Sequence, residues 1–110
     1  MTINGNKMVI YEVNIIVAAD VFPQYKDWLK SHIRKMLAFP GFLRAQTLQE
    51  EKEHDALNKY LTVQYEVQSL EFLNDYTENH AEKLRQEGLA AFPEKFTITR
   101  RIFQVLNVCW

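Results

Sequence analysis

The sequence predicts an α+β domain in which a four-stranded antiparallel sheet carries two helices on one face. Two observations lead to this prediction. Residues 8–17 and 61–67 alternate apolar and polar side chains with a period of two, which is typical of strands. The stretch after each of them repeats apolar residues at three- and four-residue steps, which is typical of helices that pack on a sheet. Two further strand-like stretches complete the order β-α-β-β-α-β.

The first strand and helix occupy residues 8–37. Asp20 is expected to cap the helix, and Pro23 suits its first turn because the early amides have no acceptor within the helix. Pro40-Gly41 predicts the turn that ends it. The apolar stripe of this helix comprises Phe22, Tyr25, Trp28, Leu29, His32, Ile33, Met36 and Leu37.

The second half of the chain repeats the pattern. Residues 42–49 form a less regular strand, expected at a sheet edge, and the charged segment 50–58 predicts a solvated loop. Ser69 is expected to cap a second helix, and Gly88 to end it as a left-handed residue. A last strand follows over residues 96–106. The stripe of the second helix comprises Leu70, Leu73, Tyr76, Thr77, His80 and Leu84.

Two right-handed crossover units in this order give the ferredoxin-like topology, with the first and third strands at the centre of the sheet. The length suits a single domain. We expect that domain to span residues 8–106, between a disordered N-terminal tail over residues 1–7 and a C-terminal tail over residues 107–110.

The sheet face without helices is expected to pair with a second copy of the chain. Two such faces pressed together make an eight-stranded barrel, in which apolar residues pack and polar ones pair across the axis. The alternative is a monomer whose open face is wet. The apolar members of this face are Ile10, Ile16, Tyr60, Phe103 and Val105, and the polar ones are Glu12, Asn14, Gln64, Glu66 and Arg101.

The composition argues against several classes of function. A net charge of −1 does not suit a nucleic-acid binder, which neutralises phosphates with a basic surface. No apolar run approaches the roughly 20 residues that cross a bilayer, and no leader opens the chain, so we expect a cytoplasmic protein without a membrane partner. Cys109 is the single cysteine, which leaves no internal disulfide. Since no P-loop, dinucleotide glycine motif, nucleophile elbow or CxxC is present, we expect no cofactor.

Five short motifs are spread over residues 8–103: Y-E-V in the first strand, W-x-x-x-H-I in the first helix, V-Q-Y-E-V in the third strand, H-A-x-x-L-R-x-E-G-L in the second helix and R-R-I in the last strand. Together they resemble an uncharacterised bacterial family, a domain of unknown function in the dimeric α+β barrel superfamily. The resemblance implies the ferredoxin-like fold and a homodimer, and it implies no established activity. More distant members, among them cofactor-independent monooxygenases, muconolactone-type isomerases, sugar mutarotases and stress-response barrels, bind small ligands between sheet and helices. The chain departs from the family pattern at Ile33-Arg34-Lys35, where a proline is expected after H-I.

A candidate ligand site lies in the layer between sheet and helices. Antiparallel register places Tyr11 opposite Tyr65 on the central strands. A rise of about 1.5 Å per residue brings His32 and His80 near the middle of the sheet. Apolar walls with a few convergent polar groups are what a small-molecule pocket requires. The candidate site therefore comprises His80 and His32 as catalytic residues and Trp28, Tyr11, Tyr65 and Arg100 as ligand-binding residues.

This site suggests a small, partly aromatic or enolic ligand. His80 would act as the general base, His32 or a tyrosine would donate a hydrogen bond, and Arg100 would hold an anion. Each residue also has a purely structural role to weigh against this one: a histidine bonded to a carbonyl, a tyrosine packed in the core, or Arg100 paired with Glu87. No metal is expected, because the two histidines lack an evident third ligand.

The sequence leaves open whether the protein is an enzyme. The main rival is a non-enzymatic structural or partner-binding dimer with a filled core. A regulatory amino-acid-binding module of the same topology needs a glycine at the first strand-to-helix turn, where this chain has Ala18-Ala19-Asp20. An RNA-binding version needs basic residues and stacking aromatics on the open face, where Glu12, Gln64 and Glu66 are expected. Whether the space under the helices is empty or filled separates ligand binding from the rival.

Overall fold

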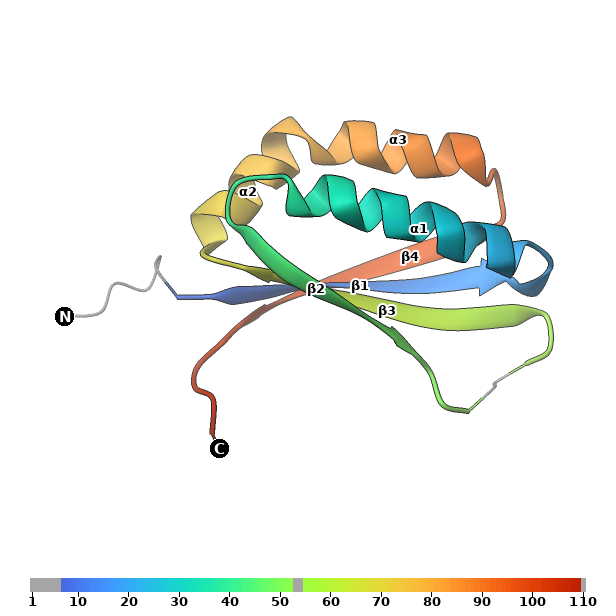
Figure 1. Cartoon of the computed structure of the whole chain (residues 1–110), viewed down its shortest axis with the longest axis horizontal. Coiled ribbons are helices and arrows are strands. Elements are labelled where there is room, and N and C mark those ends of the chain that lie inside the picture. Colours follow the sequence, from blue (N-terminus) through green and yellow to red (C-terminus); the bar gives the residue numbers. More distant parts are fainter. Residues whose placement is uncertain (1–6, 53–54, 110) are drawn as a thin grey trace.

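The computed structural model describes residues 7–52 and 55–109. Its strands form one antiparallel sheet in the order β2-β3-β1-β4, and the helices cover one face of it (Figure 1). The predicted ferredoxin-like α+β fold is confirmed. The expected N-terminal tail lies outside the described residues except for Lys7. In chain order the elements are β1 (Val9–Ala18), the short 3-10 turn η2 (Ala19–Val21), α1 (Phe22–Leu37), β2 (Phe42–Gln49), β3 (Asn58–Val67), α2 (Leu70–Asn79), α3 (Ala81–Ala91) and β4 (Phe96–Gln104).

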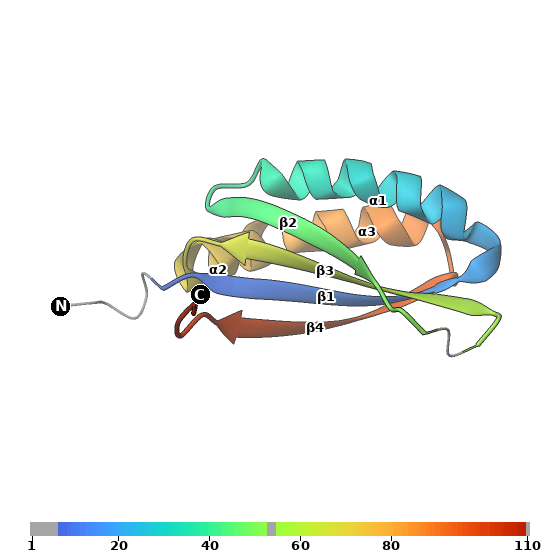
Figure 2. The ribbon, with the colours of Figure 1, turned by 60° about the horizontal axis from the view of Figure 1, so that its bottom comes forward.

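The two most apolar strands, β1 and β3, lie at the centre of the sheet, as predicted (Figure 2). Tyr11 pairs with Tyr65 and Val13 with Val63, which is the register expected from the alternation of the two strands. On the other side β4 pairs with β1 and places Arg100 beside Val13, on the face that meets the helices. The edge position of β2 is confirmed as well.

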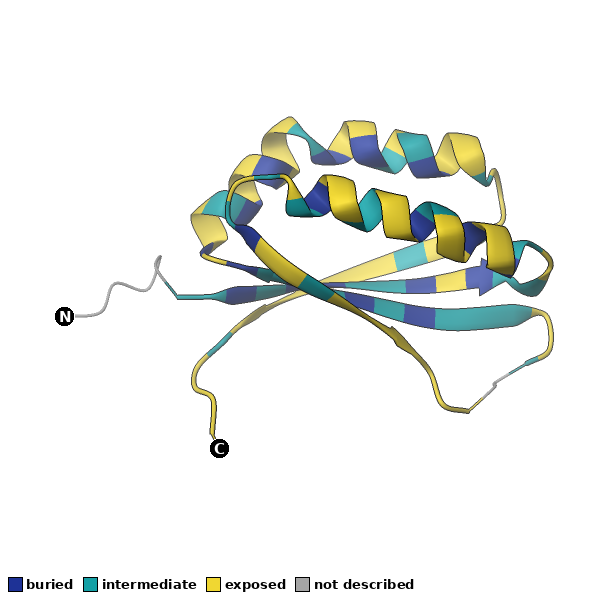
Figure 3. Ribbon diagram, in the orientation of Figure 1, coloured by how far each residue is buried: buried dark blue, intermediate teal, exposed yellow. Residues whose placement is uncertain are grey.

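The buried hydrophobic residues form one cluster in the layer between the sheet and the helices (Figure 3). Its most enclosed large side chains include Tyr25, Met36, Tyr65 and Leu73, each at most 2% exposed. Burying side chains of this size contributes about 1.5–3 kcal/mol each, so the packing of the helices on one face of the sheet stabilises the fold strongly. No helix in the described part of the chain is long and apolar enough to cross a membrane.

The second predicted helix is interrupted at His80, and the prediction of one continuous helix is therefore wrong. At His80 the backbone adopts φ −132° and ψ −28°, so α2 ends before it and α3 begins after it. The amide of His80 still donates to the carbonyl of Tyr76 at 2.9 Å, and the amide of Leu84 donates to the carbonyl of His80 at 3.4 Å. Because the apolar period continues across a one-residue break, the sequence pattern did not reveal it.

Gly88 lies inside α3 and does not end it, contrary to the sequence prediction, since the helix continues to Ala91. A Cβ atom on Gly88 would lie 3.2 Å from the ring of Trp28. The glycine thus lets α3 approach α1 closely.

The two predictions of helix caps are wrong. Asp20 accepts a hydrogen bond from the Nζ of Lys95 at 2.9 Å instead of capping α1. Ser69 precedes α2, but its side chain makes no capping hydrogen bond.

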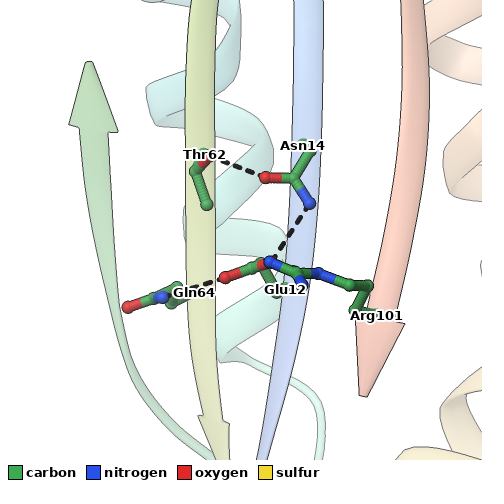
Figure 4. A network of polar contacts seen from close by, with 5 residues as sticks. All are labelled: Glu12, Asn14, Thr62, Gln64 and Arg101. Atoms are coloured by element: carbon green, nitrogen blue, oxygen red, sulfur yellow. Dashed lines mark hydrogen bonds and ion pairs between the residues drawn. The ribbon is translucent and has the colours of Figure 1, made fainter. Parts of the chain in front are cut away.

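The open face of the sheet carries a hydrogen-bonded network centred on Glu12, which is only 5% exposed (Figure 4). Glu12 accepts hydrogen bonds from Gln64 at 3.0 Å, Asn14 at 3.1 Å and Arg101 at 2.7 Å. These hydrogen bonds, of which that from Gln64 has the largest effect, hold the pKa of Glu12 below its ordinary value. These groups were expected to pair across a dimer axis. Within one chain they already bond to one another, because Glu12 and Arg101 are direct neighbours in the β1–β4 register.

Candidate functional site

A cavity of about 260 Å³ lies between the sheet and the helices. Its floor comes from β1, β3 and β4, and its walls come from α1 and α3, with Tyr76 of α2. An apolar cavity of about 150 Å³ is sufficient to bind benzene. The space therefore suits one substituted aromatic ring. The sequence left open whether the space under the helices is empty or filled, and a cavity of this volume favours ligand binding over a filled core.

The cavity brings together five of the six predicted site residues. Tyr11 and Tyr65 lie on its floor with ring centroids 6.0 Å apart, and Arg100 lies on β4. Trp28 and His32 face it from α1, one helical turn apart, with their rings stacked at 4.8 Å. The four-residue spacing that predicted the helix also places these two rings on one side of it.

His80 does not line the cavity. Its ring stacks on Phe39, in the segment between α1 and β2, with a centroid distance of 4.7 Å. The break between α2 and α3 falls at this residue, so the regular stripe on which its inward position was predicted does not hold there. Neither histidine belongs to a metal-binding cluster: within residues 7–52 and 55–109, no three His, Cys, Asp or Glu side chains come together in a way that could hold an ion.

His32 has a buried ring nitrogen, Nδ1, without a hydrogen-bond partner among the described residues. Burial is the main cause that lowers the pKa of His32 below its ordinary value of 6.5. The charge of Glu87 opposes this shift, while those of Lys35 and Arg100 add to it. The imidazole is therefore neutral at pH 7 and has one nitrogen free to accept a proton.

Three tyrosines of the cavity, Tyr25, Tyr65 and Tyr76, remain protonated at neutral pH. Burial raises the pKa of Tyr25 and of Tyr76 to about 12 each. It also raises the pKa of Tyr65, a residue that is 2% exposed. Because a phenol with such a pKa does not ionise at pH 7, these side chains can donate hydrogen bonds to a ligand but do not act as bases. The two roles that the sequence suggested for a tyrosine, a hydrogen-bond donor to a ligand and a side chain packed in the core, both stay predictions.

Arg85 of α3 is a cavity residue that the sequence analysis missed. Its Nε is buried and has no hydrogen-bond partner in the described part of the chain. Arg85 lies one residue beyond Leu84, outside the apolar stripe, so periodicity gave it no weight. The available signal was the motif H-A-x-x-L-R-x-E-G-L, in which it is the arginine.

The expected pairing of Arg100 with Glu87 is not formed. Glu87 instead accepts a hydrogen bond from the Nζ of Lys35 at 3.0 Å, which links α3 to α1. Arg100 is exposed at the edge strand and makes no ion pair with the residues that the structure describes. Its guanidinium therefore remains available to a ligand in the cavity.

A family model provides the assignment of the chain. The model described as "Domain of unknown function (DUF4286)" matches residues 8–106. The chain belongs to this family. None of the curated proteins compared is detectably similar to this DUF4286 chain.

Solved structures share the fold of this DUF4286 chain at low sequence identity. SnoaB, a cofactor-independent oxygenase from Streptomyces nogalater, is 16% identical with a TM-score of 0.67, over 93% of this chain and 96% of that one. A conserved protein of unknown function from Bacteroides thetaiotaomicron VPI-5482 is 17% identical with a TM-score of 0.69, over 91% and 99%. A candidate antibiotic biosynthesis monooxygenase from Nitrosomonas europaea is 15% identical with a TM-score of 0.68, over 96% of each chain. These similarities show a shared fold.

Proposed function

We propose that the protein binds a small, partly aromatic or enolic molecule in the cavity, and that His32 accepts a proton from it. The observation that carries this proposal is the buried, unpartnered Nδ1 of His32, a residue that lines a cavity walled by aromatic rings. A buried polar atom without a partner costs about 1–3 kcal/mol, which a ligand's donor group would recover. Stacking on Trp28 holds the imidazole plane in place for that contact.

The proposed step is a proton transfer to His32. The ligand loses a proton from an enolic or phenolic hydroxyl, or from the carbon beside a carbonyl group, and that proton goes to Nδ1. The electron pair stays on the ligand, which becomes an enolate or phenolate, and the imidazole becomes an imidazolium. The base role expected for His80 passes to His32, because only His32 lines the cavity. The shared fold with SnoaB, a cofactor-independent oxygenase, supports a reaction that begins without a cofactor.

Proton abstraction can be followed with 2-indanone, an enolisable ketone with one aromatic ring. In deuterated buffer the protein should accelerate exchange of the ketone's acidic protons, as read from the loss of their NMR signal. The His32→Ala variant should lose about 10²–10⁴-fold of this rate, which is the usual contribution of a general base. The rate should be constant above pH 6.5 and fall at lower pH, because the lowered pKa of His32 keeps the base neutral down to that range.

The His80→Ala variant separates the two possible bases. It removes an imidazole outside the cavity, so the exchange rate should stay within about twofold of the wild-type rate, an effect too small for loss of a general base. Exchange that survives His32→Ala but disappears in His80→Ala would contradict the assignment of the base. The absence of any exchange above the buffer rate would contradict the proton-transfer step itself.

We further propose that two chains pair through the open faces of their sheets. Three side chains of this face are large, apolar and 40–43% exposed: Ile16, Leu48 and Phe103. The Glu12 network among them is hydrogen-bonded within one chain, so a partner can cover it without leaving those groups unpaired. Hydrogen bonds within one chain therefore allow this face to be buried, just as hydrogen bonds between two chains would.

The homodimer predicts a sedimentation result. The wild-type protein should sediment at twice the chain mass of 13.0 kDa at micromolar concentration. Ile16→Glu places two like charges in the interface and should weaken association at least about tenfold. Ile102→Glu is the matched control, because Ile102 is 54% exposed at the same sheet but pairs with Tyr11 on the helix-facing side. A 13.0 kDa wild-type species, or equal weakening by both variants, would contradict pairing through this face.

A further inference from the structure

The cavity has an electrostatic bias that the proposed proton transfer does not require. Its lining includes Arg85 and Arg100, and none of the lining residues in the described part of the chain is an aspartate or glutamate. Since His32 is neutral at pH 7 and Tyr25, Tyr65 and Tyr76 stay protonated, the two guanidinium groups provide the charge on this lining. Glu87, whose charge acts on His32, is already paired with Lys35. A cavity with positive charge and apolar walls favours an anion.

The two arginines approach the cavity from its two layers. Arg85 comes from α3 above the sheet, and Arg100 comes from β4 within it. The charges of both lower the pKa of Tyr76, against the larger effect of burial, so both act on the same hydroxyl group. A ligand beside Tyr76 is therefore within electrostatic reach of both guanidinium groups.

Arg85 carries an unfilled donor position. Its Nε is buried and has no partner among the residues that the structure describes. A guanidinium does not lose its proton in proteins, so this N–H cannot avoid the cost of burial by becoming neutral. The Nε and one adjacent Nη form a planar fork whose spacing matches the two oxygens of a carboxylate.

We propose that the natural ligand is an aromatic monocarboxylate whose carboxylate lies between Arg85 and Arg100 and whose ring lies against Trp28 and Tyr65. This inference rests on the proposed function and defines its ligand class. The volume of about 260 Å³ admits one substituted ring. A carboxylate fills the planar fork completely, whereas a phosphate would leave a third charged oxygen to be desolvated against apolar walls.

A matched pair of probes tests the carboxylate. 4-Hydroxybenzoate and 4-hydroxybenzamide share the ring and the phenol, and they differ in charge at the opposite end. Calorimetric titration should give an affinity for the acid that exceeds that for the amide by about ten- to hundredfold, the effect of charge-assisted hydrogen bonds. Phenyl phosphate should bind more weakly than 4-hydroxybenzoate.

Variants assign the effect to the arginines. Arg85→Gln and Arg100→Gln should each weaken binding of 4-hydroxybenzoate about tenfold and leave binding of the amide unchanged. Arg85→Lys keeps the charge but not the fork and should recover only part of the affinity. Lys83→Gln is the matched control, because it removes an exposed positive charge from α3 that does not line the cavity. Arg100 is exposed, so its replacement tests the proposal without placing the fold at risk.

The outcomes distinguish this inference from the proposed function. Equal affinities for acid and amide would overturn the choice of an anion, while the cavity would still be a ligand site. Tighter binding of phenyl phosphate would overturn the choice of a carboxylate. If neither the acid nor the amide binds, the inference and the proposed function both fail. Loss of affinity in Lys83→Gln equal to that in Arg85→Gln would overturn the assignment to the cavity arginines.

Discussion

Replacing Gly41 with alanine should lower the free energy of unfolding by about 3 kcal/mol, the sum of two costs. Gly41 has φ +82°, a left-handed conformation that costs a residue with a Cβ about 1–2 kcal/mol. The new Cβ would also lie 2.3 Å from the Cγ of Phe72 on α2, an overlap that forces side chain or backbone to move. In thermal unfolding the midpoint should fall by about 10 °C or more.

Gly88→Ala is the matched control for this substitution. Gly88 is helical, and its new Cβ would meet the Trp28 ring at 3.2 Å, a contact that a small shift relieves. Alanine is favoured over glycine inside a helix by about 1 kcal/mol, which offsets that shift. Stability should therefore change little. Equal losses of stability for the two variants would mean that the turn between α1 and β2 is not constrained by the conformation of Gly41 and its contact with Phe72.

Replacing Val63 with phenylalanine should abolish ligand binding with little loss of stability. Val63 lies on β3, is 1% exposed and lines the cavity, so a phenyl ring there occupies the space intended for the ligand. A ring that enters an empty cavity avoids most of the overpacking cost of about 1–3 kcal/mol that applies in a filled core. Calorimetry with 4-hydroxybenzoate and urea unfolding measure the two effects.

Val67→Phe provides the comparison. Val67 is on the same strand and the same face, is fully buried and does not line the cavity, so phenylalanine there should cost about 1–3 kcal/mol. If Val63→Phe is destabilised as much as Val67→Phe, the layer is filled in solution. That outcome would favour the rival function, a structural or partner-binding dimer.

The fold could be predicted because two kinds of regularity agree along the chain. The alternation of apolar and polar residues in 8–17 and 61–67 predicted the central strands and which side of each faces the helices. The handedness of the crossover connections then left one strand order for the sheet. The pairing of Tyr11 with Tyr65 followed from the faces alone. Details that depend on single contacts were wrong, since the cap at Asp20 and the helix end at Gly88 are both decided by neighbours distant in sequence.

The site could be predicted only in part, for a physical reason that differs by residue. Trp28 and His32 share a turn of a regular helix, so spacing was sufficient to place them. His80 lies at a break in the helix, and periodicity carries no information about such a break. Arg85 lies outside the apolar stripe of α3, but its long side chain still reaches the cavity because its aliphatic part can pack along the helix surface. Predicting the Glu12–Arg101 pair required the register of β1 against β4. An alternating pattern shows which face of the sheet a residue lies on, but it fixes the register less directly.

The central claim is that the cavity between sheet and helices takes a small aromatic ligand, and a methyl NMR titration tests it most directly. On addition of 4-hydroxybenzoate or 4-hydroxybenzamide, the methyl signals of Val63, Leu84 and Ile98, which line the cavity, should shift. The signals of Ile10 and Ile16 on the open face should stay in place. Unchanged signals at millimolar concentrations of both probes, or shifts confined to the open face, would contradict the account.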